Sequence, residues 1–66
     1  MREEEMELST YINGNLKADT VYQGGHYGAR FYDKEGNIIK TEFYQGHSET
    51  YAENAAENYV FGIKVV

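Results

Sequence analysis

The sequence predicts an α+β fold: an antiparallel sheet of four or five strands with one α-helix in the C-terminal half, in the order ββββαβ. Three observations lead to this class. Segments rich in β-branched and aromatic residues alternate with glycine-containing turns over residues 6–44. An alanine-rich segment follows at residues 48–60, and an apolar stretch follows at residues 61–66. A chain of 66 residues without cysteine has room for one core, so we expect a single domain over residues 1–66.

The first residues of the chain are strongly acidic. Residues 1–7 hold four glutamates against one basic residue, Arg2, which gives a local net charge of 1 − 4 = −3. A segment of this composition buries little apolar surface. We therefore expect residues 1–6 to form a frayed, acidic N-terminus.

The middle of the chain contains four expected strands, at residues 6–12, 16–22, 27–32 and 38–44. An internal repeat supports this interpretation, because two short segments recur 36 − 14 = 22 residues later. Five of the seven aligned pairs are identical when residues 14–16 and 21–24 are set against residues 36–38 and 43–46. A repeat of this length, with glycine at fixed points, predicts two successive hairpins.

The expected turns have the chemistry that hairpins require. Asn13-Gly14 predicts a type I′ turn, because both central residues of that turn need φ > 0, which Asn and Gly tolerate. Residues 33–36 predict a longer turn that Gly36 closes in the left-handed region.

Side chains along the fourth expected strand alternate between two faces. Ile39, Thr41 and Phe43 point one way, and the other, wetter face carries Ile38, Lys40, Glu42 and Tyr44. Tyrosine is frequent on this wetter face, and two interpretations stay open. One is an interface half in water. The other is ordinary cross-strand packing of Tyr22, Tyr27, Tyr32 and Tyr44.

Residues 48–60 carry the signals of one helix. Ser48 can cap its N-terminus, Glu49 lies in the first turn where the helix dipole favours an anion, and Gly62 marks its end. The residues expected to face the sheet recur at helical spacing and are Ala52, Ala55, Ala56, Tyr59 and Val60.

Three glutamates recur every four residues on another side of this helix: Glu49, Glu53 and Glu57. Successive carboxylates then lie roughly 6 Å apart along the helix axis. Like charges at this spacing destabilise a helix by about 0.2–0.5 kcal/mol per pair, and no lysine four residues away offsets them. The row indicates an acidic binding surface, with a merely solvated helix face as the alternative.

Residues 61–66 predict a short last strand, which returns to the sheet or pairs with its copy in a second chain. A core this small supplies roughly 3–5 kcal/mol. The chain has no cysteine and therefore no disulfide to add stability. We therefore expect a homodimer, which supplies the burial that one chain lacks.

The sequence shows no catalytic constellation, and we expect neither an enzyme nor a bound cofactor. Ser9 lacks a neighbouring base, and the glycine-rich residues 24–28 lack the lysine of a phosphate-binding loop. His26 and His47 have only Glu49 near them in sequence, so no metal site is expected.

Net charge and hydropathy limit the possible partners. The net charge of 6 − 11 = −5 argues against direct binding to nucleic acid. No apolar run has the length of a secretion signal or a membrane span. We therefore expect a cytoplasmic protein that does not contact a membrane.

Residues 27–66 resemble the short phage-encoded inhibitors of uracil-DNA glycosylase in size, acidity and order of elements. The resemblance rests on the hairpin of residues 32–46, the helix that Ser48 begins, and the terminal apolar stretch. It implies a homodimer whose surface imitates DNA inside the groove of the host enzyme. In that family an aromatic residue, a carboxylate and apolar residues of the helix engage the enzyme, and by position these are Tyr51, Glu53, Ala52 and Ala56.

With the acidic row and the end of the fourth strand added, the candidate partner-binding residues are Glu42, Tyr44, Glu49, Tyr51, Ala52, Glu53, Ala56 and Glu57. Residues 22–46 are also similar to membrane occupation and recognition nexus repeats, through their spaced Tyr and Gly residues. That second resemblance implies a ribbon of β-hairpins used as a scaffold.

Three hypotheses on function follow. The first is a small acidic inhibitor from a phage or mobile element, which binds a host DNA-processing enzyme, uracil-DNA glycosylase, as a DNA mimic and blocks its DNA-binding groove. The alternative is a tyrosine-rich β-hairpin module that binds another protein and has no inhibitory role. The third is direct stacking of nucleic acid on the aromatic sheet, which the charge of −5 opposes.

Overall fold

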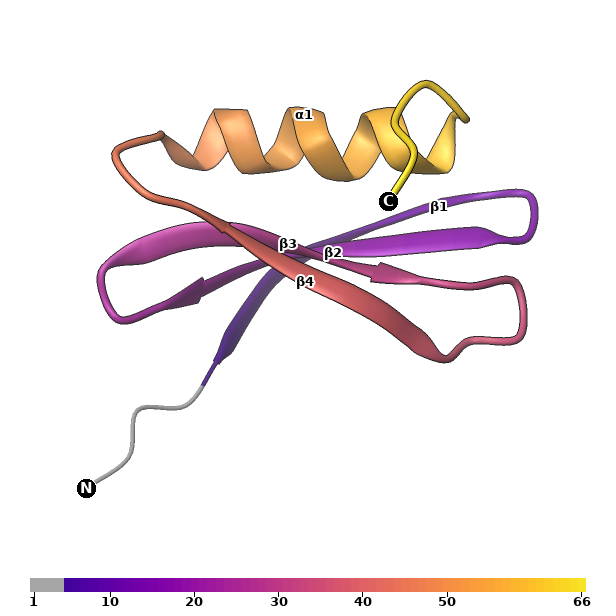
Figure 1. Cartoon of the computed structure of the whole chain (residues 1–66), viewed down its shortest axis with the longest axis horizontal. Helices are drawn as coiled ribbons and strands as arrows, with labels where there is room; N and C mark the ends of the chain where they lie inside the picture. The colour runs from indigo at the N-terminus through magenta and orange to yellow at the C-terminus, as the bar shows by residue number, and fades with distance from the viewer. Residues whose placement is uncertain (1–4) are drawn as a thin grey trace.

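The computed structural model describes residues 5–66 and arranges them in two layers, a sheet and a helix (Figure 1). The sheet is antiparallel with the strand order β1-β2-β3-β4, so each strand pairs with the next one in sequence. The elements are β1 (Met6–Asn13), β2 (Leu16–Gln23), β3 (His26–Tyr32), β4 (Ile38–Tyr44) and α1 (Glu49–Val60). The predicted α+β class, the first four predicted strands and the helix are therefore confirmed.

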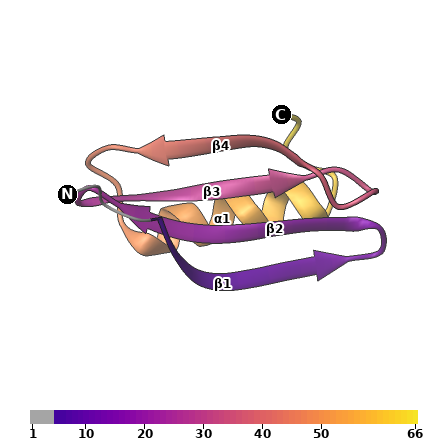
Figure 2. The same ribbon diagram turned by 90° about the horizontal axis from the view of Figure 1, so that it is seen from below.

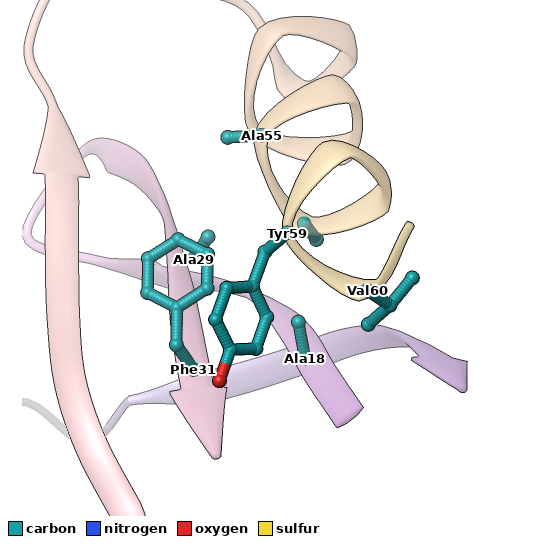
Figure 3. Close-up of a cluster of buried hydrophobic side chains, with 7 residues drawn as sticks. Ala18, Ala29, Phe31, Ala55, Tyr59 and Val60 are labelled. Atoms are coloured by element: carbon teal, nitrogen blue, oxygen red, sulfur yellow. The ribbon is translucent and has the colours of Figure 1, made fainter. Parts of the chain in front are cut away.

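Helix α1 covers one face of the sheet, and Figure 2 shows the opposite face, which we call the open face. The core lies between α1 and the two central strands (Figure 3). Its buried residues are Ala18, Ala29, Phe31, Ala55, Ala56, Tyr59 and Val60. The rings of Phe31 and Tyr59 meet edge to face with centroids 5.0 Å apart. The predicted inward stripe of the helix is confirmed, and its alanines let the helix lie close to the sheet.

Both predicted helix ends are confirmed. The hydroxyl of Ser48 accepts a hydrogen bond from the backbone N–H three residues later, at 3.3 Å. At the other end, Gly62 adopts φ +80° and its N–H donates to the Tyr59 carbonyl at 3.0 Å. The N–H of Ile63 donates to the Asn58 carbonyl at 2.8 Å. These two bonds form a Schellman motif, which terminates the helix.

The predicted last strand at residues 61–66 is wrong. These residues contain turns and a bend but no strand. The N–H groups of Ile63 and Lys64 both donate to the Asn58 carbonyl, at 2.8 and 3.0 Å, so neither can join a strand ladder. Val66 instead packs against the core, and the order of elements is ββββα.

The first hairpin turn differs from the predicted type. Asn13 pairs with Leu16 in the β1–β2 ladder, so the two loop residues are Gly14 and Asn15. Only Gly14 has φ > 0, at +60°. A glycine with positive φ at the first central position defines a type II′ turn, so the predicted type I′ turn around Asn13-Gly14 is wrong.

The longer turn between β3 and β4 is built as predicted. Gly36 adopts φ +91°, and its N–H donates to the Asp33 carbonyl at 3.0 Å. The Asp33 carboxylate also accepts from the backbone N–H groups of Glu35 and Asn37, at 3.0 and 2.9 Å. One side chain therefore orders the whole turn.

We expected residues 1–6 to be frayed, but the last two of them, Glu5 and Met6, hold defined positions. Met6 is the first residue of β1 and pairs with Tyr22 of β2. Glu5 forms an ion pair with Arg30 of β3. Residues 1–4 lie outside the described residues.

The expected faces of β4 are reversed. Glu42 pairs with the core residue Ala29, and Tyr44 packs against the core, so both lie on the side of the sheet that α1 covers and not on a wetter face. Ile38 does not follow them, because the register irregularity at Ile39 makes it the partner of Tyr32 on the open face. Ile39 and Phe43 are 49% and 37% exposed. The charged side chains on the covered face are tolerated there because they pair with one another at its rim, as described below.

Candidate partner-binding site

The row of carboxylates predicted on α1 is present, and we call Glu49, Glu53 and Glu57 the acidic flank. Glu49 and Glu57 are exposed, and Glu53 is half-buried. Within residues 5–66, none of the three lies within ion-pair distance of a Lys, Arg or His side chain. Because the adjacent face of α1 is buried in the core, the row stands on a rigid support.

Ala52 and Ala56 lie in the core instead of on a binding surface. Both side chains are fully buried between helix and sheet. The helical spacing that brings them near the acidic flank also turns them toward the sheet. A partner cannot contact either side chain in this fold.

The remaining candidates, Tyr51 of α1 with Glu42 and Tyr44 of β4, lie where the other side of α1 faces β4. At about 100° per residue, Tyr51 is rotated by roughly 160–240° around the helix from the acidic flank. Its ring meets Tyr44 of β4 edge to face, with centroids 5.1 Å apart. His47 stacks on Tyr51 with centroids 3.8 Å apart and an interplanar angle of 17°. The predicted residues therefore separate into two surfaces.

A groove of about 410 Å³ follows this second side of the helix, and we call it the β4-side groove. Its lining combines aromatic rings, carboxamides and one cation, from Tyr44, Tyr51, Asn54, Ala55, Asn58, Ile63 and Lys64. The volume falls in the range of roughly 300–1,000 Å³ that is typical of small-ligand sites. Sequence analysis missed Ile63 and Lys64 here, because the expected last strand placed residues 61–66 elsewhere. It also missed Asn54 and Asn58, because helical spacing alone does not show which side of α1 faces β4.

Glu42 lies next to this groove and is neutralised within the chain. The Tyr44 hydroxyl donates to Glu42 at 2.8 Å, and the ammonium groups of Lys40 and Lys64 lie 3.2 and 3.3 Å from its oxygens. Burial opposes ionisation of Glu42, but the hydrogen bonds from Tyr44, Lys40 and Lys64 outweigh burial and lower its pKa. Burial and the bond to Glu42 raise the pKa of Tyr44. Glu42 is therefore charged but adds little to the acidic flank.

The open face of the sheet holds a polar cluster that sequence analysis missed. Asp19 is fully buried, and it accepts hydrogen bonds from the hydroxyls of Tyr32 at 2.6 Å and Thr10 at 2.8 Å. The Arg30 guanidinium lies 3.5 Å from Asp19 and also pairs with Glu5. Burial and the bond to Asp19 raise the pKa of Tyr32.

This cluster is fully satisfied, because every buried polar side-chain atom of residues 5–66 has a partner. We therefore assign it to stability and not to binding. The only signal of this cluster in the sequence is Asp19 itself, because aspartate is unfavourable within a strand. Its partners come from other strands, and no local spacing in the sequence connects them.

The tyrosines do not form one platform on the sheet. Tyr22 and Tyr27 are paired across β2 and β3, and their rings meet edge to face at 4.9 Å. Tyr32 lies five residues after Tyr27 on β3 and therefore on the opposite face. For Tyr22 and Tyr27, cross-strand packing is the interpretation that the structure supports.

The part of the chain that the structure describes contains no group of three or more His, Cys, Asp or Glu side chains that could hold a metal ion. Among those same residues, no helix is long and apolar enough to cross a membrane. Comparison of the chain with protein-family models, curated proteins and solved structures found no match.

Proposed function

We propose that this protein is a non-enzymatic inhibitor that binds a DNA-processing enzyme as a DNA mimic. The observation that carries the proposal is the acidic flank: three neighbouring carboxylates without a basic partner in the described chain, on a helix whose inner face is fixed to the sheet. The row offers negative charges at a regular spacing of roughly 6 Å on a rigid backbone. Such a surface suits a cleft built to bind phosphates.

The physical basis of the inhibition is electrostatic. Enzymes that act on nucleic acid focus positive potential in the substrate cleft. A protein with a net charge of −5 is steered toward that cleft, and it excludes the substrate without any chemistry of its own. Leaving the three carboxylates unpaired makes the helix slightly less stable, which supports a role in binding.

The specific target that we propose is the uracil-DNA glycosylase of a host cell, with a phage or mobile element as the source. This choice rests on the resemblance of residues 27–66 to the short phage inhibitors of that enzyme. The test is uracil excision from a single-stranded oligonucleotide, with increasing amounts of this protein and a parallel measurement of binding to the oligonucleotide alone. Stoichiometric loss of cleavage without oligonucleotide binding is the expected result. Full cleavage at large excess of the protein would remove this target.

The acidic flank itself is tested by charge reversal. We expect Glu53→Lys to weaken binding to the target enzyme at least about tenfold, which corresponds to about 1.4 kcal/mol. The melting temperature should stay equal or rise slightly, because the substitution removes like-charge repulsion along the helix. Glu35→Lys, in the exposed turn after β3, changes the net charge equally and should leave binding nearly unchanged. Intact binding after reversal of all three flank carboxylates would contradict the proposal.

A protein-interaction module without inhibitory activity is the second candidate. The observation that favours it is the β4-side groove, where rings and carboxamides border a cavity of about 410 Å³. In that case binding to a partner protein depends on the groove, and Asn54→Ala weakens it while Glu53→Lys does not. The same pair of variants therefore separates the two candidates.

A further inference from the structure

Within residues 5–66, no strand pairs with the outer edge of β4. β4 is the last strand in the sheet order, and residues 61–66 do not pair with it. Apolar side chains gather along this edge, with Ile38, Ile39 and Phe43 exposed by 59%, 49% and 37%. An open strand edge with exposed apolar side chains is a template for pairing with another chain.

The side chains of β4 are arranged symmetrically about Thr41. Lys40 and Glu42 flank it, and Ile39 and Phe43 follow on either side. If two β4 strands pair antiparallel with Thr41 opposite Thr41, Lys40 lies opposite Glu42 of the other chain, and Ile39 lies opposite Phe43. Opposite charges and apolar residues placed directly across a ladder each contribute about 0.2–1 kcal/mol. The edge is therefore complementary to itself, as a two-fold interface requires.

The other edge of the sheet lacks this symmetry. Each edge strand carries one register irregularity, β1 between Glu7 and Ser9 and β4 at Ile39, so the irregularity does not distinguish them. The symmetric centre of β4, residues 40–42, lies in the part that pairs with β3 in continuous register. The charged residue of β1, Glu7, would lie opposite Ile12 if β1 paired with itself about its midpoint. The two edges therefore differ, and only β4 offers complementary charges.

We propose that a second copy of this chain docks along β4, antiparallel and centred on Thr41, so that two sheets join into one of eight strands. The two-fold axis then passes perpendicular to the sheet, and both α1 helices lie on the same face. Lys40 is 53% exposed and lies 3.2 Å from Glu42 of its own chain, so its ammonium can exchange this partner for Glu42 of the second copy. The acidic flanks point away from the axis, so this inference does not depend on the proposed function.

The experiment measures molar mass by sedimentation equilibrium. The wild-type protein is expected at 2 × 7.6 = 15.2 kDa. Lys40→Glu places two carboxylates opposite each other across the interface, and Glu42→Lys places two ammonium groups there. Each variant alone should therefore weaken dimerisation at least about tenfold. An equimolar mixture of the two variants should restore a 15.2 kDa species, because each chain then meets the opposite charge.

The mixture also separates loss of pairing from loss of folding, since misfolded chains would not restore the dimer. The double variant Lys40→Glu with Glu42→Lys should dimerise as well as the wild type. Lys34→Glu, in the exposed turn, is the matched charge control and should stay dimeric. A wild-type mass of 7.6 kDa would overturn the proposal. A dimer that survives both single reversals, or a mixture that stays monomeric, would overturn the β4 register.

Discussion

At the scale of single residues, Asp19 is the one charged side chain among residues 5–66 that is fully buried. A fully buried carboxylate is costly unless hydrogen bonds and a cation compensate it, and here two hydroxyls and Arg30 do so. These partners come from β1 and β3, on either side of the strand that carries Asp19. The cluster therefore links three strands on the face that has no helix over it.

The first prediction concerns this cluster. Asp19→Asn keeps the shape of the side chain but removes the charge that Arg30 faces and one acceptor for the two hydroxyls. We expect the free energy of unfolding to fall by about 1–3 kcal/mol, measured by urea denaturation. Glu35→Gln loses the same charge at an exposed position and should change stability by less than about 0.5 kcal/mol. Equal stability of both variants would contradict the role assigned to Asp19.

The second prediction is the effect of alkaline pH through Tyr44. Burial and the bond to Glu42 raise its pKa above the ordinary value of 10.0. Below pH 10 the phenol is protonated in both the folded and the unfolded chain, so its contribution is fully present. Above pH 10 the unfolded chain loses this proton first, and stability falls as the pH rises toward the folded pKa.

Tyr44→Phe removes this contribution. Above about pH 10, the unfolding free energy of the variant should decline less steeply than that of the wild type, by up to about 1.4 kcal/mol per pH unit. Urea denaturation at several alkaline pH values measures both slopes. Tyr22→Phe is the control, because Tyr22 forms a ring contact with Tyr27 and, among the described residues, no hydrogen bond to a carboxylate. Parallel slopes for Tyr44→Phe and the wild type would contradict the argument.

At the scale of elements, the pairing of β3 with β4 depends on the absence of a side chain at Gly28. A Cβ there would meet the Glu42 carbonyl oxygen and lie 2.8 Å from Cδ1 of Phe43. Gly28 is the partner of Phe43 in the ladder, so the Phe43 side chain occupies the space that glycine leaves. Strand β4 can approach β3 closely only for this reason.

The third prediction follows from that contact. Gly28→Ala should lower the unfolding free energy by about 1–3 kcal/mol or more, although glycine to alanine in an unstrained strand is normally favourable. Thermal unfolding measures the loss. Repeating the substitution in a Phe43→Ala background should not restore stability, because the backbone carbonyl remains in place. Full recovery in that background would show that only the ring is in the way.

Sequence reasoning found the elements well and failed where distant groups decide the outcome. Strand composition, the Ser48 cap and the Gly62 stop are local signals, and these elements form where expected. The predicted last strand is wrong because the N–H groups of Ile63 and Lys64 both donate to the Asn58 carbonyl, which composition cannot show. The first turn was predicted one residue too early, because the β1–β2 ladder continues through Asn13.

At the scale of the whole molecule, the candidate site was predicted only in part. Helical periodicity placed the acidic flank correctly, since it depends on one element alone. It could not show that Tyr51 faces β4 while the acidic flank faces away, because that depends on how α1 is rotated on the sheet. The β4-side groove needs three separate segments, and local patterns give no information on their meeting.

The order of the strands in the sheet, β1-β2-β3-β4, has a consequence for biosynthesis. Every strand hydrogen-bonds to the strand made just before it, so each hairpin can close as soon as its second strand leaves the ribosome. Helix α1 is synthesised after all four strands, and it brings the side chains that complete the core over β2 and β3. Until that moment the growing chain exposes the apolar face of an unfinished sheet, so nascent chains stalled before Ser48 should be the species that chaperones retain.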